Sequence, residues 1–315
     1  MDDVLIEAEG LRKVHAPRGG GEELEAVAGI GFRVRRGEAF GFLGPNGAGK
    51  STTMRMIAAV SPVSGGTLRV LGLDPAEDGA AIRARLGSVP QDDTLDTELT
   101  VRENLLVYGR YFGLPRAEIR ARTTRLLDFA RLADKADEQV EALSGGMRRR
   151  LTIARSLINE PEILLLDEPT TGLDPQARHL LWERLFRLKQ QGVTLLLTTH
   201  YMDEAEQLCD RIVVMDHGRI VAEGSPRELI EAHCTREVLE LRFAPDTALD
   251  GVAAEVAGIG ERAEVLPDRL LVYADDGESA LKAVHATGVG PQAALVRRAG
   301  LEDVFLTLTG RTLVD

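Results

Sequence analysis

One short segment limits the fold more than any other part of the chain. Residues 44–51 read GPNGAGKS and fit the pattern G-x-x-x-x-G-K-S/T at every fixed position. They follow an apolar run at 39–43 and precede a helical pattern over about 50–60. Glycines in such a loop let backbone N–H groups close around phosphate oxygens, and the helix start adds a dipole that favours anions. The segment predicts a strand–loop–helix unit of an α/β fold that binds the phosphates of a nucleotide.

Four side chains in two segments predict the chemistry. Lys50 can reach the β- and γ-phosphates of ATP, and the Ser51 hydroxyl can ligate Mg²⁺. Residues 163–166 form a buried type of strand that ends in Asp167 and Glu168. Asp167 is suited to binding Mg²⁺, whereas Glu168 points elsewhere because side chains alternate along a strand. We expect Glu168 to orient and deprotonate an attacking water.

A second glycine-rich helix start lies at 143–147, LSGGM, where Ser144 is a natural N-cap. Arg148, Arg149 and Arg150 follow in the first turn, where positive charge opposes the helix dipole. Two interpretations are open. Either an anion docks at this turn, or the arginines are solvated and pair with nearby acids.

The wider pattern predicts two domains. From residue 163 apolar strands alternate with helices of about 6 to 17 residues, which is typical of a mostly parallel sheet covered by helices. A capping box at 100–103 begins the first helix of an all-helical lobe, which spans about 92–160, and a second capping box at 225–228 begins a helix before the character of the chain changes. We place the first domain at 1–230. Residues 235–315 follow the order β-α-β-β-α-β, which predicts a small ferredoxin-like domain.

Composition excludes several classes of function. The chain has 38 Lys plus Arg and 50 Asp plus Glu, so its charge of −12 disfavours a general affinity for nucleic acid. Two cysteines, Cys209 and Cys234, make no disulfide framework. The longest apolar runs are far shorter than the roughly 20 residues of a membrane span. Any membrane role is therefore expected to come through a partner.

Five motifs follow one another along the chain: GPNGAGKST, VPQ at 89–91, LSGGM, LLLDEP, and TTH at 198–200. Together they resemble the nucleotide-binding subunit of ATP-binding cassette (ABC) transporters, over about residues 3–230. The resemblance implies a P-loop NTPase cassette with a mostly parallel sheet, an antiparallel β subdomain and an α-helical lobe. It also implies a homodimer in which the P-loop of one subunit and the LSGGM loop of the other sandwich each ATP.

The resemblance assigns roles to further residues. Gln91 would sense Mg²⁺ and the attacking water, and His200 would contact the γ-phosphate. Asp174 would lie at the dimer contact, although an Asp before a Pro is also a good helix cap. The predicted catalytic residues are Glu168, His200 and Gln91; the predicted Mg²⁺ ligands are Ser51, Gln91 and Asp167; the predicted nucleotide contacts are Gly44, Pro45, Asn46, Gly47, Ala48, Gly49, Lys50, Ser51, Thr52, His15, Ser144, Gly145 and Gly146.

Two positions depart from the family pattern. Met147 stands where the family usually carries Gln, and this leaves the serine and glycines of the loop in place. His15 aligns with the aromatic residue that stacks on adenine, and imidazole stacks less well than Tyr. A solvated loop histidine is the alternative interpretation of His15.

Three segments, 95–115, 172–185 and 301–311, resemble the branch that serves drug and polysaccharide export, including the ATPases of nodulation-signal export and daunorubicin resistance. This implies an ATP-hydrolysing motor for a separately encoded multispan permease, placed in the cytoplasm on the inner face of the membrane. The expected cargo is a drug, a lipid-linked molecule or a polysaccharide. Two alternatives stay open: a soluble cassette ATPase that acts on ribosomes or DNA, and an importer subunit.

Overall fold

A computed structural model describes residues 3–16 and 23–310, in two compact units, Met1–Glu223 and Gly224–Asp315. The glycine run 19–21, a composition typical of a flexible loop, lies outside the described residues.

A six-stranded sheet forms the centre of the first unit, with the order β5-β6-β7-β3-β8-β9. The pairs β5–β6, β6–β7, β7–β3 and β3–β8 are parallel, as predicted. Strands covered on both faces are apolar throughout instead of alternating, which explains why runs such as ILLLD have no period of two. The strands are β3 (Ala39–Leu43), β5 (Leu86–Val89), β6 (Ile163–Asp167), β7 (Thr194–Thr199), β8 (Arg211–Asp216) and β9 (Arg219–Gly224).

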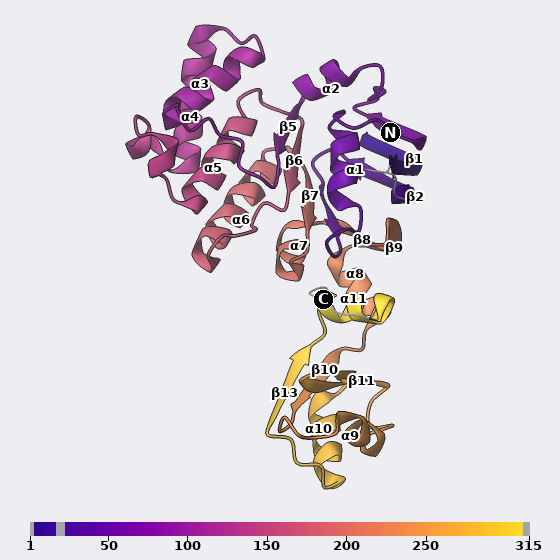
Figure 1. Cartoon of the computed structure of the whole chain (residues 1–315). Helices are drawn as coiled ribbons and strands as arrows, with labels where there is room; N and C mark the ends of the chain where they lie inside the picture. The colour runs from indigo at the N-terminus through magenta and orange to yellow at the C-terminus, as the bar shows by residue number, and fades with distance from the viewer. Residues whose placement is uncertain (1–2, 17–22, 311–315) are drawn as a thin grey trace. The chain divides into compact units, whose positions relative to one another are not determined.

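The helical lobe lies to one side of this sheet (Figure 1). Its first helix begins at Thr100, whose hydroxyl accepts a hydrogen bond from the backbone of Glu103 while the Glu103 carboxylate accepts one from Thr100. The capping box that the sequence predicted is thus present. The lobe contains α3 (Val101–Tyr111), α4 (Arg116–Ala130) and α5 (Gly145–Ser156), with short turns at Ala133–Lys135 and Val140–Ala142; the other helices of the unit are α1 (Lys50–Ile57), α2 (Gly79–Ala84), α6 (Pro175–Gln190) and α7 (Met202–Leu208).

An antiparallel sheet, β2-β1-β4, packs on the other side of the unit (Figure 1). It comprises β1 (Val4–His15), β2 (Leu24–Arg35) and β4 (Gly65–Val70). The first two strands are longer than the short β-type patterns that the sequence has at 4–8 and 32–34. Register shifts occur at Gly10, with φ +56°, and Gly29, with φ +81°, and these bulges break the alternation of apolar residues without ending the strands.

The second unit contains an antiparallel sheet of order β11-β12-β10-β13, formed by a β-α-β-β-α-β chain. The predicted ferredoxin-like topology is confirmed. This compact unit begins at Gly224 and also includes α8, which contacts α11. Its elements are α8 (Pro226–His233), β10 (Glu237–Arg242), α9 (Leu249–Glu255), β11 (Arg262–Leu266), β12 (Arg269–Ala274), α10 (Gly277–Ala286), β13 (Ala293–Arg298) and α11 (Leu301–Thr309).

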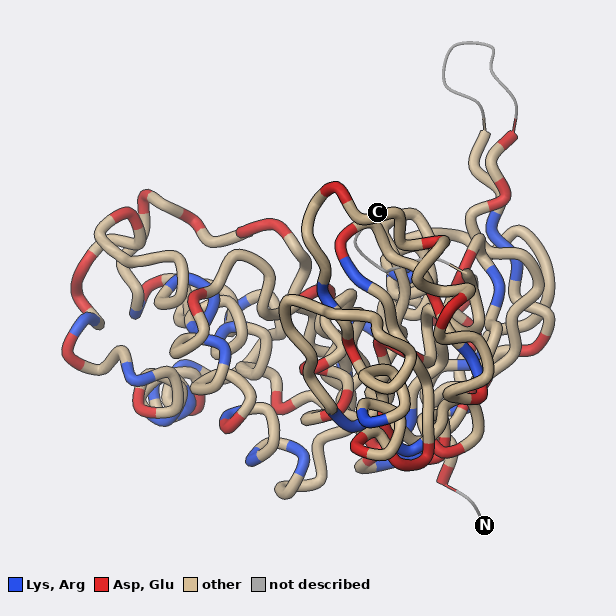
Figure 2. The backbone as a smooth tube through the Cα atoms, turned by 90° about the horizontal axis from the view of Figure 1, so that it is seen from below, with Lys and Arg blue, Asp and Glu red and all other residues tan. Residues whose placement is uncertain are grey.

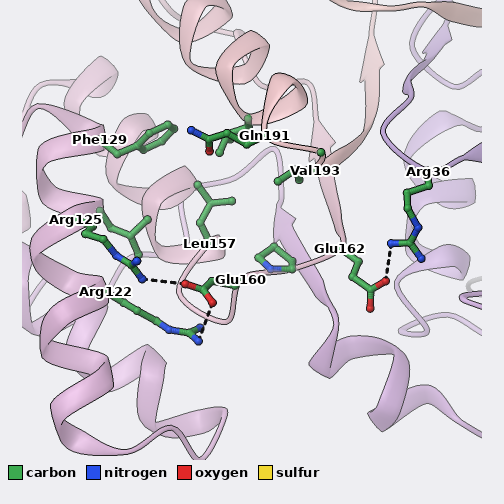
Figure 3. A pocket seen from close by; sticks show the side chains of 13 residues that line it. Arg36, Arg122, Arg125, Phe129, Leu157, Glu160, Glu162, Gln191 and Val193 are labelled. Atoms are coloured by element: carbon green, nitrogen blue, oxygen red, sulfur yellow. Dashed lines mark hydrogen bonds and ion pairs between the residues drawn. The ribbon is translucent and has the colours of Figure 1, made fainter.

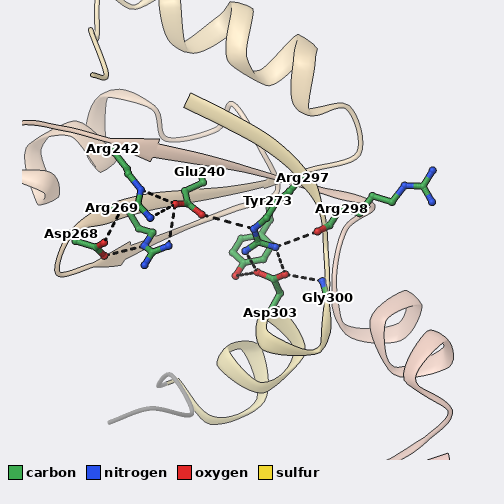
Figure 4. A network of polar contacts seen from close by, with 9 residues as sticks. All are labelled: Glu240, Arg242, Asp268, Arg269, Tyr273, Arg297, Arg298, Gly300 and Asp303. Carbon is green, nitrogen blue, oxygen red and sulfur yellow. Dashed lines mark hydrogen bonds and ion pairs between the residues drawn. The ribbon is translucent and has the colours of Figure 1, made fainter. Parts of the chain in front are cut away.

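A buried carboxylate joins α11 to this sheet (Figure 4). Asp303 accepts hydrogen bonds from both terminal nitrogens of Arg297, at 2.7 and 2.8 Å, and from the backbone of Gly300 at 2.9 Å. The Tyr273 hydroxyl donates to the same carboxylate at 3.2 Å. Burial, followed by the charge of Asp303, raises the pKa of Tyr273, so this hydroxyl stays a donor.

Acidic and basic residues are intermixed along the backbone of the described chain (Figure 2). Within the part of the chain that the structure describes, no helix is both long and apolar enough to cross a membrane.

Candidate functional site

The predicted site residues follow the carboxyl ends of neighbouring parallel strands. The glycine-rich loop follows β3, Glu168 follows β6, His200 follows β7, and Gln91 lies just beyond β5. Because β3, β7, β6 and β5 are successive neighbours in the sheet, these ends meet along one edge. Ligands of open α/β sheets bind outside such an edge.

The loop at 44–49 is tightly packed on one side and open on the other. A Cβ at Gly49, where φ is +100°, would lie 2.4 Å from the carbonyl oxygen of Ala26, and a Cβ at Gly44 would lie 2.2 Å from that of Met215. At Gly47, with φ +82°, a Cβ would meet no atom within 4 Å. The loop thus needs glycine for its backbone path, and its tip leaves room for a ligand to approach the backbone.

Lys50 lies inside this loop and is 4% exposed. Its Nζ donates to the carbonyl oxygens of Gly44 at 2.6 Å and Pro45 at 3.0 Å. Burial lowers the pKa of Lys50, while the nearby charges of Glu168 and Asp167 oppose that shift. A cation held at the mouth of a glycine-rich loop is suited to binding phosphate oxygens.

Ser51 and Asp167, two of the predicted Mg²⁺ ligands, contact each other. The Ser51 hydroxyl donates to Asp167 Oδ1 at 2.8 Å, and Thr198 Oγ1 donates to the same oxygen at 2.5 Å. Hydroxyl and carboxylate oxygens are the ligands that Mg²⁺ prefers. Among the described residues no group of three or more His, Cys, Asp or Glu forms a metal site, so a magnesium ion here would rely on one carboxylate and on substrate phosphates.

Three other predicted site residues, Gln91, Lys50 and His200, lie beside the Glu168 carboxylate. It is 6% exposed and has a φ of +45°, a conformation that is uncommon outside glycine and often found at functional sites. Gln91 Nε2 donates to Glu168 Oε2 at 3.2 Å, and Lys50 Nζ lies 3.9 Å from Oε1. His200 Nδ1 lies 3.4 Å from Oε1 and, among the described residues, has no hydrogen-bond acceptor or donor.

Threonines complete the surroundings of this carboxylate. Thr171 Oγ1 donates to Glu168 Oε2 at 3.2 Å, and the backbone N–H of Glu168 donates to Thr198 Oγ1 at 3.0 Å. Sequence reasoning did not single out Thr171, and it noted Thr198 only as part of the TTH motif. The signal for Thr198 was its place one residue before the end of a buried strand.

Two predicted helix caps are confirmed. Ser144 Oγ accepts from the backbone of Met147 at 3.3 Å at the start of α5, and Asp174 Oδ1 accepts from that of Ala177 at 2.8 Å at the start of α6. Ser144 is exposed, and a Cβ on Gly145 would meet nothing within 4 Å. The LSGGM loop therefore presents an open helix start to its surroundings.

His15 is the last residue of β1, is exposed, and pairs with Leu24 of β2. The same strand β2 supplies the Ala26 carbonyl that packs against Gly49. His15 therefore pairs with β2 only a few residues from the point where β2 packs against the phosphate loop.

Neither interpretation of the three arginines holds for Arg149 and Arg150. Arg149 donates to backbone carbonyl oxygens around Glu168, and Arg150 donates to those of Ala130, at 2.6 Å, and Arg131. One sequence feature could have indicated that Arg149 points inward: it lies four residues before the buried Ile153 and therefore on the same face of α5.

A separate cavity lies at the opposite edge of the sheet (Figure 3). Glu162, which precedes β6, and Val193, which precedes β7, both line it. Its basic groups are paired: Arg36 Nη1 with Glu162 at 2.9 Å, and Arg122 and Arg125 with Glu160, each at 2.9 Å. This cavity contains none of the predicted site residues.

Two families of known proteins match separate parts of the chain. Residues 27–171 match the family described as ABC transporter, and residues 250–310 match the C-terminal domain of the nodulation factor export protein NodI. A Nod factor export ATP-binding protein I of Ralstonia nicotianae is 50% identical over 315 residues, covering 99% of this chain and 95% of the relative. That of Paraburkholderia xenovorans is 48% identical and covers 100% of both chains.

Solved structures match the first unit. A dimeric ATP-binding cassette in a post-hydrolysis state, bound to ADP and Pi, is 26% identical with a TM-score of 0.65, covering 70% of this chain and 98% of the other. The cbiO1 protein of Clostridium perfringens, part of the ABC transporter complex cbiONQ, is 30% identical with a TM-score of 0.65, covering 73% and 92%.

Proposed function

The chain belongs to the ABC transporter ATPases, among the Nod factor export ATP-binding proteins, and we propose that it is the ATP-hydrolysing motor subunit of an export system with a separate membrane permease. One observation carries the chemistry of this proposal. Lys50, Asp167 and Glu168 converge at the edge of the sheet where the glycine-rich loop begins.

In this mechanism the loop backbone and Lys50 bind the phosphates of ATP, with Thr52 at the start of α1. Ser51 and Asp167 would hold Mg²⁺, with Gln91 beside them, and the ion when bound neutralises charge on the phosphates. Glu168 accepts a proton from the attacking water. His200 then contacts the γ-phosphate from its position 3.4 Å from the Glu168 carboxylate.

Two copies of the chain complete the site. The open helix start at 144–146 offers backbone N–H groups to the phosphates bound by the partner copy, because a helix N-terminus favours anions. Asp174, at the start of α6, lies at the contact between copies. ATP binding closes this homodimer, and hydrolysis opens it.

The permease contacts the surface around residues 91–114, which holds Gln91 and the exposed Tyr111 of α3. This places the protein at the inner face of the cell membrane. Cargo of the drug, lipid-linked or polysaccharide class is proposed because the relatives are named for Nod factor export. Crosslinking from this segment in native membranes should recover a multispan protein. Recovery of ribosomes or DNA instead would favour the soluble alternative.

Two substitutions separate binding from chemistry. Glu168→Gln keeps the side-chain shape and should lower the rate of phosphate release by roughly 10²–10⁴. ATP should still bind, so gel filtration with ATP and Mg²⁺ should show a persistent dimer. Lys50→Ala removes the phosphate counter-charge, and both binding and dimer should be lost.

A matched control lies at the other end of the same strand. Glu162→Gln changes a carboxylate that pairs with Arg85 and Arg36, away from the site, and should leave hydrolysis near the wild-type rate. Wild-type hydrolysis by Glu168→Gln would overturn its catalytic role. An inactive Glu168→Gln variant that stays monomeric at saturating ATP would overturn the sandwich dimer.

The two units are also proposed to be separate domains. Limited proteolysis should cut near residues 222–226, where the chain passes from one compact unit to the next. The fragment of about residues 1–223 should still bind ATP. Cuts spread evenly through both units would contradict the boundary.

A further inference from the structure

Arg149 is the most heavily used side chain near the predicted catalytic carboxylate, yet it belongs to neither the phosphate loop nor the metal site. Its Nη2 donates to the carbonyl oxygens of Asp167 at 3.0 Å and Glu168 at 3.1 Å. Its Nε donates to the carbonyl oxygen of Pro169 at 2.8 Å. One guanidinium therefore holds three successive peptides at the end of β6.

The same side chain also reaches the segment after β5. Arg149 Nη1 donates to the carbonyl oxygen of Pro90 at 2.5 Å and lies 3.5 Å from that of Gln91. The peptides of Gln91 and Glu168 are thus joined through one group, and their side chains meet at 3.2 Å. Three elements share this junction: α5, the segment after β5, and the segment after β6.

We propose that Arg149 is a positioning residue for ATP hydrolysis, which fixes the Glu168 carboxylate and the Gln91 amide relative to each other by binding their backbones. The inference rests on the proposed role of Glu168. Through Arg149, helix α5, which begins in the LSGGM loop, is hydrogen-bonded directly to the backbone of Glu168. A shift of α5 when the loop binds the partner's ATP would move this backbone.

The backbone at Glu168 needs such support. Its φ of +45° is a conformation that persists only where the surroundings hold it. A planar guanidinium with donors on three nitrogens can bind several carbonyl oxygens at once, whereas the ammonium of lysine is a compact point charge. Burial lowers the pKa of Arg149, and the carboxylates of Glu204, Asp167, Asp93 and Glu168 oppose that shift.

The neighbouring arginine provides a matched control. Arg150 Nη1 donates to the carbonyl oxygens of Ala130 and Arg131, at the end of α4 within the helical lobe. It has the same chemistry and the same kind of partner, but it contacts no residue of the phosphate or water-activating groups named above. Arg149→Met and Arg150→Met therefore separate positioning from a general loss of lobe stability.

In steady-state hydrolysis, replacing Arg149 should change kcat much more than the KM for ATP. In Arg149→Met, kcat should fall roughly 10- to 100-fold, the scale of a reacting group displaced by about 1 Å. The KM for ATP should change less than about threefold, because Arg149 contacts neither Lys50 nor Ser51 and reaches Asp167 only at its backbone carbonyl oxygen. Arg150→Met should keep kcat within about twofold. Arg149→Gln keeps two N–H donors, so its kcat should lie between those of Arg149→Met and the wild type. If Arg149→Met does not fold, the kcat of Arg149→Gln tests the proposal.

A double-mutant cycle tests whether Arg149 acts through Glu168. Adding Arg149→Met to Glu168→Gln should cost less than about threefold further in single-turnover rate, because the group it positions has already gone. Equal losses in both backgrounds, or a loss confined to KM, would overturn the proposal. So would equal effects of the Arg149 and Arg150 variants. A wild-type rate for Glu168→Gln alone would instead overturn the catalytic role of Glu168, so the two failures are distinguishable.

Discussion

Replacing Asp303 by asparagine should loosen the second unit locally while the first unit stays intact. The carboxylate is 1% exposed and receives hydrogen bonds from Arg297, Gly300 and Tyr273 (Figure 4). The amide has one oxygen acceptor and turns an NH₂ group toward donors. It therefore removes the nearer charge partner of the Arg297 guanidinium and leaves only the Glu240 carboxylate, 4.0 Å from Nε.

The size of the effect follows from burial. Removing one partner of a buried ion pair costs about 3–5 kcal/mol, and Arg297 is itself 28% exposed, so we expect the lower end, about 3 kcal/mol. A tenfold change in equilibrium corresponds to about 1.4 kcal/mol. Opening of β13 and α11 should therefore become roughly a hundredfold more frequent.

Hydrogen exchange followed by mass spectrometry measures this opening in the full chain. Peptides that cover β12, β13 and α11 should exchange roughly a hundredfold faster in Asp303→Asn, and peptides of the first unit should not change. Asp268→Asn is the matched control. That carboxylate also pairs with an arginine, Arg269, at 2.9 Å, but it is 53% exposed, so its loss should cost less than about 1 kcal/mol.

Wild-type protection of α11 in Asp303→Asn would refute this reasoning. It would mean that the apolar contacts of α11 hold the helix without the ion pair. Equal effects of the Asp303 and Asp268 substitutions would show that charge, and not burial, governs the change.

Three further predictions concern the loop, the adenine contact and the thiols. Gly49→Ala would place a Cβ 2.4 Å from a carbonyl oxygen of β2 at a φ of +100°. The ATP affinity of this variant, measured by calorimetry, should therefore fall more than about tenfold. The control Gly37→Ala has a φ of +73° but no atom within 4 Å of the added Cβ, so its ATP affinity should stay at the wild-type value. If His15 stacks on adenine, His15→Tyr should tighten ATP by about 1 kcal/mol, and unchanged affinity would place the adenine contact elsewhere. Burial raises the pKa of Cys209 and, although Cys234 is only partly buried, raises that of Cys234 to about 11. Neither thiol of the folded protein should therefore react quickly with iodoacetamide at pH 8, and rapid labelling of either thiol before denaturation would contradict this reasoning.

The sequence alone determined the elements whose chemistry lies in neighbouring residues. A phosphate loop requires its glycines, lysine and serine at set spacings, so residues 44–51 identify it without any tertiary contact. The acids after 163–166 and the capping boxes at Thr100 and Ser225 are local in the same way, and the structure contains both boxes. The order of strands and helices was sufficient to predict the mostly parallel sheet of the first unit and the β-α-β-β-α-β chain of the second.

Tertiary structure alone decided what distant segments do to one another. Arg149 lies 59 residues from Pro90 and 18 from Asp167 along the chain, and no local pattern records which carbonyl oxygens face its side chain. Likewise α8 has a cap that the sequence predicts, but its place in the second unit follows from packing on α11 near the far end of the chain. Spacing along a helix or strand is a local geometric property, whereas the partner of a buried side chain is set only when remote elements pack together.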